Sequence, residues 1–301
     1  MKLLPRRALI LGANGLLGQN LAKAFAGDYE VLAVAAQPEP RVPMAGVQYQ
    51  SCDVAARAEI KKLIKNFIPN YILNAAAFTD VDGSETKREE CWRVNATAVG
   101  HIAEAAKSIA ARLIHVSTDY VFDGSAAPYT EESRPQPLGY YGKAKLAGEN
   151  ALSTSGANYA IARTMILYGS GKNVRSNFVT WLIGQLRAEK EVHIVNDQYG
   201  NPTLASELAA AMRKLAESKP NGVFHLSGAE TMARYDFAVQ VARVFELNEK
   251  LIHPVTTAEL GQAAKRPMNS GFDISKAQRE LGVSMSNVVE GLRKFKEELE
   301  S

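Results

Sequence analysis

A glycine-rich loop directly after a short apolar run constrains the fold of this chain more than any other feature. Residues 7–11 read as a buried strand, and residues 12–18 follow at once as Gly-Ala-Asn-Gly-Leu-Leu-Gly. The next segment, Gln19 to Phe25, has helical character. Strand, glycine loop and helix in this order form the unit that cradles a dinucleotide pyrophosphate at the helix N-terminus. A tight strand-to-helix turn without a ligand gives the same local pattern and remains an alternative.

The end of the second predicted strand bears on which nicotinamide cofactor would bind. That strand, Tyr29 to Ala35, leads into Ala36, Gln37 and Pro38, where a site selecting NAD often carries an acidic residue. This chain has no acidic residue at that position, since Glu39 lies beyond the proline. The absence leaves room for a 2′-phosphate, and the nearest arginine is Arg41. The sequence therefore leans toward NADPH and leaves NADH open.

Further strands are predicted over residues 48–52, 71–74 and 112–116, separated by helical segments. This alternation predicts an α/β fold with a doubly wound parallel sheet of the Rossmann type. The second half of the chain supplies a smaller, mainly C-terminal α/β substrate domain. We expect a dinucleotide-binding domain over residues 1–168, with returning elements around 196–228, and the substrate domain mainly over residues 169–301.

Residues after two of these strands have two interpretations each. Asp53 could accept a hydrogen bond from an adenine amino group, or it could cap the following helix. Ala75, Ala76 and Ala77 could let a flat cofactor lie against the backbone, or they could pack a helix. Asn95, inside a predicted helix over residues 91–110, reads as a solvated polar residue.

Candidate acid–base residues follow the strand at 112–116. Tyr141 and Lys145 are four residues apart at the start of a predicted helix, so both lie on one face. A nearby ammonium favours a phenolate, and we expect it to lower the pKa of Tyr141 toward a useful range. A hydroxyl of Ser117 or Thr118, at the carboxyl end of the strand, could hydrogen-bond the same carbonyl oxygen or cap its own backbone. Ordinary surface helices also contain the Tyr–Lys spacing.

Composition excludes several classes of protein. The formal net charge is +3 with scattered basic residues, so neither nucleic acid nor a membrane surface is expected as a partner. Two cysteines make no disulfide framework, and the apolar run at residues 8–11 is too short for a signal peptide, so we expect a cytoplasmic protein. The five histidines show no paired metal-ligand spacing, and no catalytic metal is expected.

Several motifs in order resemble the extended short-chain dehydrogenase/reductase family. They are GANGLLG from Gly12, NAAAFTDVD from Asn74, STDYVFDG from Ser117, YGKAKLAGE from Tyr141, NDQYGNPT from Asn196 and AKRPMNS from Ala264. The resemblance implies NADPH- or NADH-dependent reduction of the 4-keto group of a nucleotide-linked 6-deoxysugar, converting dTDP-4-dehydro-L-rhamnose to dTDP-L-rhamnose in dTDP-L-rhamnose biosynthesis. It also implies that Tyr141 donates the proton, Thr118 orients the oxygen, and Lys145 holds the nicotinamide ribose.

The same resemblance assigns binding residues. The implied cofactor contacts are Gly15, Leu16, Leu17, Asp53, Val54, Ala77, Phe78, Thr79, Tyr141 and Lys145. The glycine loop and the alanines after the strand at 71–74 add Gly12, Asn14, Gly18, Ala75 and Ala76 as expected cofactor contacts. The implied substrate contacts are Thr118, Asp119 and Ile166, with Asn177 as either a substrate contact or a helix start. A bidentate guanidinium suits a diphosphate, so Arg266, with Lys265 beside it, is the candidate for the substrate pyrophosphate.

Two departures from the family pattern leave alternatives open. Ile166 stands where the family has a sugar-contacting tryptophan, and no acidic residue ends the second strand. A reductase or epimerase of a different nucleotide sugar is therefore one alternative. A non-catalytic, cofactor-binding regulatory subunit is another, because the beta subunit of methionine adenosyltransferase resembles this family. Oligomeric state stays open, with a homodimer as one option.

Overall fold

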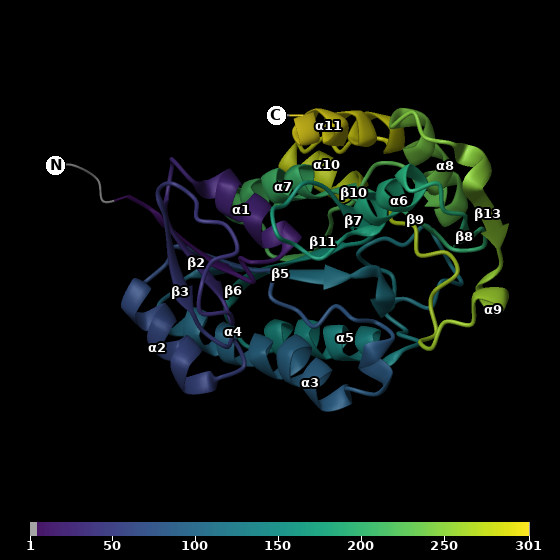
Figure 1. The fold of residues 1–301 in the computed structure, drawn as a ribbon. Coiled ribbons are helices and arrows are strands. Elements are labelled where there is room, and N and C mark those ends of the chain that lie inside the picture. The colour runs from purple at the N-terminus through teal and green to yellow at the C-terminus, as the bar shows by residue number, and fades with distance from the viewer. Residues whose placement is uncertain (1–4, 301) are drawn as a thin grey trace.

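A seven-stranded parallel sheet forms the centre of the molecule in this computed structural model, which describes residues 5–300 (Figure 1). The strand order is β11-β6-β5-β4-β1-β2-β3. In chain order the strands are β1 (Arg7–Leu11), β2 (Glu30–Ala35), β3 (Val47–Ser51), β4 (Tyr71–Asn74), β5 (Arg112–Thr118), β6 (Asn158–Thr164) and β11 (Gly222–His225). The chain leaves β1 first toward β3 and then toward β6, so the strand order reverses between β1 and β4. The predicted doubly wound fold class is confirmed.

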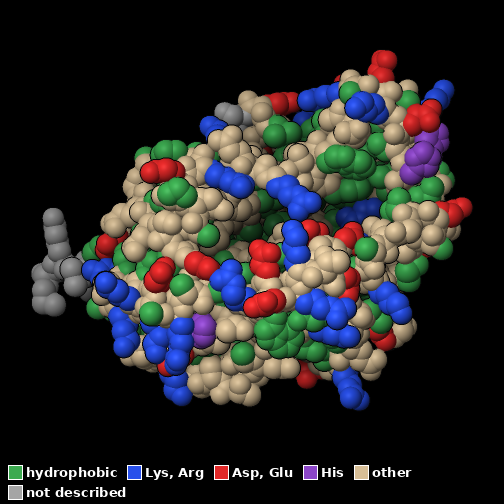
Figure 2. All heavy atoms as spheres, turned by 60° about the horizontal axis from the view of Figure 1, so that its bottom comes forward, with side chains coloured by type: hydrophobic (Ala, Val, Ile, Leu, Met, Phe, Trp, Pro, Cys, Tyr) green, Lys and Arg blue, Asp and Glu red, His purple; other side chains and the backbone are tan. Residues whose placement is uncertain are grey.

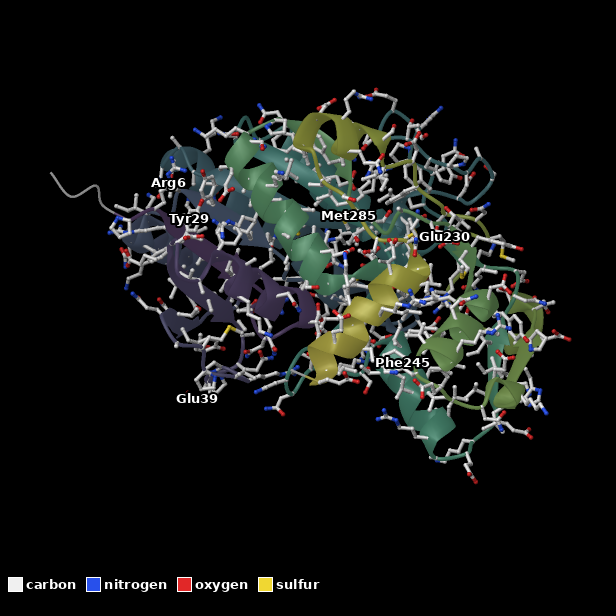
Figure 3. All side chains as sticks on the ribbon, turned by 90° about the horizontal axis from the view of Figure 1, so that it is seen from above. Arg6, Tyr29, Glu39, Glu230, Phe245 and Met285 are labelled. Atoms are coloured by element: carbon white, nitrogen blue, oxygen red, sulfur yellow. The ribbon has the colours of Figure 1, made fainter. Side chains whose placement is uncertain are left out.

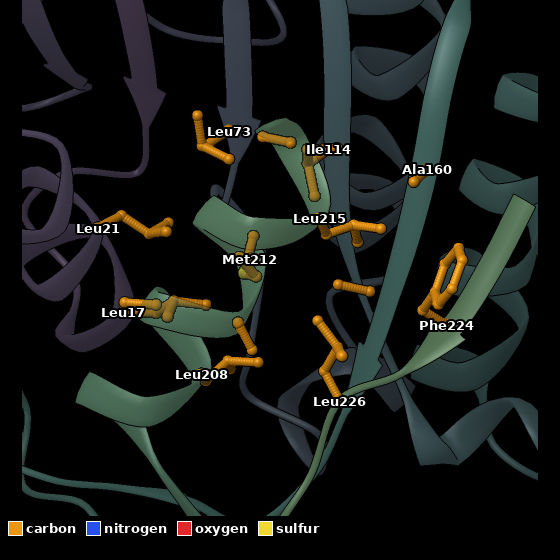
Figure 4. Packing of buried hydrophobic residues seen from close by; sticks show 14 of the residues in the cluster. Leu17, Leu21, Leu73, Ile114, Ala160, Leu208, Met212, Leu215, Phe224 and Leu226 are labelled. Carbon is orange, nitrogen blue, oxygen red and sulfur yellow. The ribbon is translucent and has the colours of Figure 1, made fainter. Parts of the chain in front are cut away.

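Helices cover both faces of this sheet, as its buried apolar strands require. One face carries α1 (Leu16–Phe25), α7 (Ala205–Ser218) and α10 (Ser275–Leu281). The other carries α2 (Arg57–Phe67), α4 (Ala98–Ser108) and α5 (Tyr140–Ser153). Figure 4 shows the first face, where leucines of α1 and α7 meet Leu73, Ile114 and Ala160 from three neighbouring strands.

A smaller lobe with its own core lies beyond the carboxyl ends of the strands (Figure 1). Its main elements are α6 (Phe178–Arg187), β8 (Val192–Val195), α8 (Arg234–Val244), β13 (Ile252–Val255), α9 (Thr257–Leu260) and α11 (Val288–Glu300). Two short strand pairs join the lobes: β7 (Leu167–Tyr168) with β10 (Thr203–Leu204), and β9 (Tyr199–Gly200) with β12 (Met232–Ala233). Figure 3 labels Phe245, from the small-lobe core, and Met285, from the large-lobe core.

The chain crosses between the lobes more than once. The helix α7 and strand β11 return to the large lobe, in the region where returning elements were expected. The helix α10 also packs on α7 and β11, although residues 169–301 were expected to belong mainly to the substrate domain. The division at residue 168 stays a prediction, with α10 as a further element on the large-lobe side.

Short helical turns lie between the longer elements. They are η1 (Gly83–Glu85), α3 (Arg88–Trp92), the π-helical turn η2 (Arg93–Thr97), η3 (Asp119–Val121) and η4 (Glu249–Leu251). Across the face shown in Figure 2, acidic and basic side chains are interspersed. Within residues 5–300, every helix is too short or too polar to cross a membrane.

Candidate active site

The carboxyl ends of β1, β4 and β5 meet at one edge of the sheet, beside the point where the strand order reverses. The glycine loop follows β1, the three alanines follow β4, and Thr118 ends β5. In open parallel sheets, ligands bind in the crevice at this position. The expected cofactor loop and the expected hydroxyl therefore lie at the same edge of the sheet, on β1 and β5, with β4 between them.

The glycine loop has the close backbone packing that a pyrophosphate site requires. Gly12 has φ +82, in the left-handed region, and a Cβ on Gly18 would lie 2.1 Å from the Gly12 carbonyl oxygen. Gly15 is the N-cap of α1 without a side-chain capping bond, and the first turn has no acidic residue. The N–H groups at this helix end, which lack intrahelical partners, can therefore donate hydrogen bonds to an anion. Leu17 is buried beneath them.

The segment after β4 lies directly against this loop. A Cβ on Gly12 would lie 2.6 Å from the Ala76 nitrogen, so Ala75 and Ala76 flank the loop backbone. Phe78 is held by Asn95, whose side-chain oxygen accepts the Phe78 N–H at 3.0 Å and whose amide donates to the Phe78 carbonyl at 2.9 Å. Asn95 is buried in the π-helical turn η2, so its expected solvent exposure is wrong.

Asp53 is not the N-cap of α2. Its Oδ1 accepts the Ala55 N–H at 2.9 Å, whereas Ala56 is the N-cap and makes no side-chain bond. Its Oδ2 pairs with Arg93 Nη1 at 2.6 Å. Burial raises the pKa of Asp53, but the hydrogen bonds from Arg93 and Ala55 outweigh it and hold that pKa below its usual value. The adenine-contact interpretation of Asp53 and of the buried Val54 stays a prediction.

The loop after β2 is tied to the glycine loop through Asn14. The Asn14 amide donates to Gln37 Oε1 at 3.0 Å, and its side-chain oxygen accepts the Arg41 N–H at 2.9 Å. Arg41 Nη1 lies 3.5 Å from the Asn14 carbonyl oxygen. The arginine nearest in sequence to the strand end is thus also near the cofactor loop in space. A 2′-phosphate could meet its guanidinium there.

Thr118 and Asp119 form a buried hydrogen-bonded pair at the end of β5. Thr118 Oγ1 donates to Asp119 Oδ1 at 3.0 Å and accepts the Tyr120 N–H at 3.2 Å, so the backbone-capping interpretation is also realised. Asp119 Oδ2 accepts from Ser270 Oγ at 2.6 Å. Burial raises the pKa of Asp119, and the bonds from Ser270 and Thr118 oppose this. To donate to a substrate oxygen, Thr118 must turn its hydroxyl away from Asp119.

Tyr141 faces Thr118 from the first turn of α5. Its ring packs edge-on against Tyr120, with centroids 5.5 Å apart. Burial and the Asp119 carboxylate raise the pKa of Tyr141, and a hydrogen bond with Thr118 opposes the rise only in part. The expected lowering of this pKa by Lys145 is therefore wrong for this state. In this state the phenol of Tyr141 keeps its proton.

Lys145 is almost completely buried, and its ammonium group points at β5 instead of at the tyrosine. Nζ donates to the Val116 carbonyl at 2.6 Å and lies 3.4 Å from His115 Nε2. Burial lowers the pKa of Lys145 to about 8, although the Glu149 carboxylate acts in the opposite direction. The nicotinamide-ribose role stays a prediction.

Two expected substrate residues lie at the junction of the lobes. Ile166 has φ +45, an unusual conformation for a β-branched residue. A Cβ on Gly200 would lie 2.8 Å from Ile166 Cδ1 and 3.5 Å from Ser270 Oγ, so Ile166 borders the Asp119 cluster. Asn177 caps α6: its side-chain oxygen accepts the Val179 and Thr180 N–H groups, and its amide donates to the Gly169 carbonyl. The helix-start interpretation of Asn177 is confirmed.

The guanidinium of Arg266 is already occupied. It makes a bidentate pair with Asp82, at 2.9 and 2.8 Å, and also donates to the Ala264 carbonyl. We expected this guanidinium to bind the substrate diphosphate. In the structure the Asp82 carboxylate, from the segment after β4, already occupies it. Lys265 is exposed beside it.

Arg234, which sequence reasoning missed, is a further cation near Asp119 and Arg266. It begins α8, and its Cζ lies 5.1 Å from the Phe178 ring centroid. Tyr120, Asp119 and Arg266 lie within electrostatic reach. Within residues 5–300, its guanidinium forms no hydrogen bond or ion pair. No local motif marks this residue, because an arginine at a helix start is common.

Together these groups can bind a dinucleotide along the strand ends and move a proton at an oxygen atom beside it. The glycine loop and the alanines are the expected cofactor contacts, and Tyr141 and Thr118 face each other. Among residues 5–300, no group of three His, Cys, Asp or Glu side chains is arranged to hold a metal ion.

Comparison with known proteins identifies relatives along nearly the whole chain. The family model described as "RmlD substrate binding domain" matches residues 6–301. A dTDP-4-dehydrorhamnose reductase of Aggregatibacter actinomycetemcomitans is 34% identical over 96% of this chain and 98% of its own length. The methionine adenosyltransferase 2 subunit beta of Xenopus laevis is 34% identical over 91% of this chain and 82% of its own. A crystal structure of the Bacillus anthracis dTDP-4-dehydrorhamnose reductase with NADP superposes with TM-score 0.88 at 29% identity, covering 98% of this chain and 100% of that one.

Proposed function

The chain belongs to the RmlD substrate-binding-domain family, and we propose that it is an NAD(P)H-dependent oxidoreductase that reduces dTDP-4-dehydro-L-rhamnose to dTDP-L-rhamnose. The observation that carries this proposal is the meeting of Thr118, Tyr141 and the glycine loop at the carboxyl edge of one sheet. Relatives that share this family across nearly their full length include named reductases and an NADP complex. The enzyme acts on a nucleotide-linked sugar, and we place it in the cytoplasm.

When bound, a nicotinamide cofactor would supply the hydride for C4 of the sugar. The chain fits such a cofactor, because Gly12 and Gly18 let the backbone of the loop pack closely on itself and on Ala75 and Ala76, and the N-terminus of α1 follows the loop. Tyr141 holds the proton for the C4 oxygen, since burial keeps its phenol protonated. Thr118 orients that oxygen once its hydroxyl leaves Asp119, and Asp119 with Ser270 can then bind a sugar hydroxyl. Lys145 reaches the ribose by leaving the Val116 carbonyl.

Oxidation of NADPH and of NADH, followed at 340 nm with a panel of nucleotide 4-keto-6-deoxysugars, tests the proposal. We expect dTDP-4-dehydro-L-rhamnose to give the highest kcat/KM in the panel. Turnover of a different sugar alone would support the alternative that Ile166 suggests. Cofactor binding without turnover of any sugar would favour a non-catalytic subunit, the role suggested by the relatives named methionine adenosyltransferase 2 subunit beta. Sedimentation of the same preparation would test the homodimer.

The substrate diphosphate should depend on Arg234 more than on Arg266. A charge-assisted hydrogen bond contributes roughly 1.5–3 kcal/mol, so we expect Arg234→Gln to weaken dTDP binding about 10- to 100-fold. Calorimetric titration with dTDP and with thymidine measures the effect, and the preference for dTDP should shrink in the variant. Arg243→Gln is the matched control, because Arg243 is on the same helix and pairs with Glu249 at the surface. Equal losses for dTDP and thymidine would contradict the assignment.

A further inference from the structure

His115 is a fully buried histidine beside the proposed catalytic residues, and the mechanism above does not use it. It lies on β5, and in the strand register its direct neighbour on β4 is Asn74. Asn74 Nδ2 lies 3.0 Å from His115 Nδ1, and Lys145 Nζ lies 3.4 Å from His115 Nε2. Asn74, His115 and Lys145 therefore form a continuous row from the end of β4 to α5.

The hydrogen bonds of Asn74 determine which imidazole nitrogen carries the proton. Asn74 Oδ1 accepts the Ala76 N–H at 3.2 Å, so its amide group must face the imidazole. An amide N–H is a donor, and His115 Nδ1 must accept it. Burial and the Lys145 charge lower the pKa of His115 well below its usual value, so the ring is neutral. Its single proton therefore lies on Nε2 and points toward Lys145.

Two donors face each other when Lys145 is charged. An ammonium has three N–H donors and no acceptor, so it cannot receive the His115 Nε2–H. A neutral amine has one lone pair that accepts this N–H, and it keeps donors for the Val116 carbonyl, 2.6 Å away. Only the amine form can accept the His115 Nε2–H while it donates to the Val116 carbonyl. The lowered pKa of Lys145, about 8, agrees with this arrangement.

The other ionisable groups around Lys145 do not favour its amine form. Glu149, one turn along α5, favours the ammonium, but its carboxylate forms a buried bidentate pair with Arg163 at 3.0 and 2.6 Å. Cys91 also favours the ammonium, and burial raises the pKa of its thiol. Tyr141, one turn back, keeps its proton. His115 is the side chain in this set whose hydrogen bond opposes the charge.

We propose that His115, oriented by Asn74, is a positioning residue that favours the amine form of Lys145 and so allows this lysine to release and regain a proton during turnover. After Tyr141 gives its proton to the substrate oxygen, a phenolate remains. An ammonium that is easily deprotonated can restore the phenol by transferring one proton to it. The link to turnover rests on the proposed reductase function, whereas the effect of His115 on the charge of Lys145 does not.

Nuclear magnetic resonance titration of labelled lysine, with Lys145→Arg for assignment, tests the proposal directly. A hydrogen bond of ordinary strength corresponds to roughly half to one pH unit, so we expect the Lys145 midpoint to rise by about that amount in His115→Phe. Asn74→Asp should also raise it, because a carboxylate accepts the Nδ1–H and removes the proton from Nε2. His225→Phe, at another buried strand histidine, is the control and should leave the midpoint unchanged.

The pH profile of kcat/KM gives the second readout. In both variants its alkaline limb should move to higher pH, together with the Lys145 midpoint. A merely structural role of His115 would not cause this shift. An unchanged midpoint in His115→Phe and Asn74→Asp overturns the proposal, whatever the activity. A shifted midpoint in a protein that reduces no sugar would leave the His115 effect standing and remove the proposed function. If His115→Phe does not fold, the Lys145 midpoint in Asn74→Asp tests the proposal alone.

Discussion

Replacing Tyr141 with phenylalanine is expected to lower kcat about 10²- to 10⁴-fold, the usual contribution of a positioned acid–base group. The substitution removes only the hydroxyl and leaves the ring in its edge-on contact with Tyr120. Cofactor affinity should change little, because the glycine loop and the alanines after β4 supply most of the expected cofactor contacts. Single-turnover absorbance at 340 nm and cofactor fluorescence titration measure the two effects separately.

Tyr140→Phe is the matched control for this experiment. Tyr140 is the preceding residue, but its ring faces Trp92 and Arg88 on the outer side of the helix. We expect this variant to keep the wild-type rate. Equal turnover of Tyr141→Phe and wild type would remove Tyr141 from the role of proton donor and leave the rest of the site to be reassigned.

The raised pKa of Tyr141 gives the pH dependence a definite sign. A pKa above the usual phenol value means that the proton donor for reduction persists through neutral and moderately alkaline pH. The reverse oxidation needs the phenolate and should therefore increase with pH. A reductive rate that falls as the pH rises would then report another group, and Lys145, with its pKa lowered to about 8, is the candidate.

Much of the large lobe could be predicted from local sequence signals. The bounds of β1 and β4 were predicted residue for residue, because short apolar runs there end at glycine or at a polar residue. The rule that ligands bind at the carboxyl ends of parallel strands then directed attention to the edge of the sheet where the glycine loop follows β1 and Thr118 ends β5. The helical spacing of Tyr141 and Lys145 put both side chains on the inner face of α5. These inferences depend on neighbours in sequence and on sheet geometry alone.

The pairings between distant segments could not be predicted in the same way. Arg266 meets Asp82 across 184 positions of the chain, and no local pattern shows that its guanidinium is occupied. Asn95 interrupts a helix with a π-helical turn to hold Phe78, although its sequence context is that of a solvated residue. Lys145 turns to the Val116 carbonyl because a buried donor needs an acceptor. Such choices are set by tertiary packing.

Gly142→Ala is expected to lower both activity and stability, because the residue after Tyr141 lies against backbone. A Cβ there would lie 2.1 Å from the Tyr120 carbonyl oxygen, so α5 would have to move away from the η3 turn that follows Thr118. A displacement near 1 Å at a catalytic group can cost about 10²-fold in rate, and overpacking costs roughly 1–3 kcal/mol of folding free energy. Thermal denaturation and kcat measure the two losses.

Gly184→Ala separates this close approach from the general effect of adding a methyl group to a helical glycine. Gly184 lies inside α6, and a Cβ there would meet nothing within 4 Å. Alanine is favoured over glycine in a helix by about 0.5–1 kcal/mol, so this variant should be more stable and fully active. If Gly142→Ala behaved like Gly184→Ala, the tight contact between α5 and η3 would not be needed to bring Tyr141 to Thr118. A loss of activity and stability in Gly142→Ala, with neither loss in Gly184→Ala, would show that Gly142 is needed to position Tyr141 and Lys145.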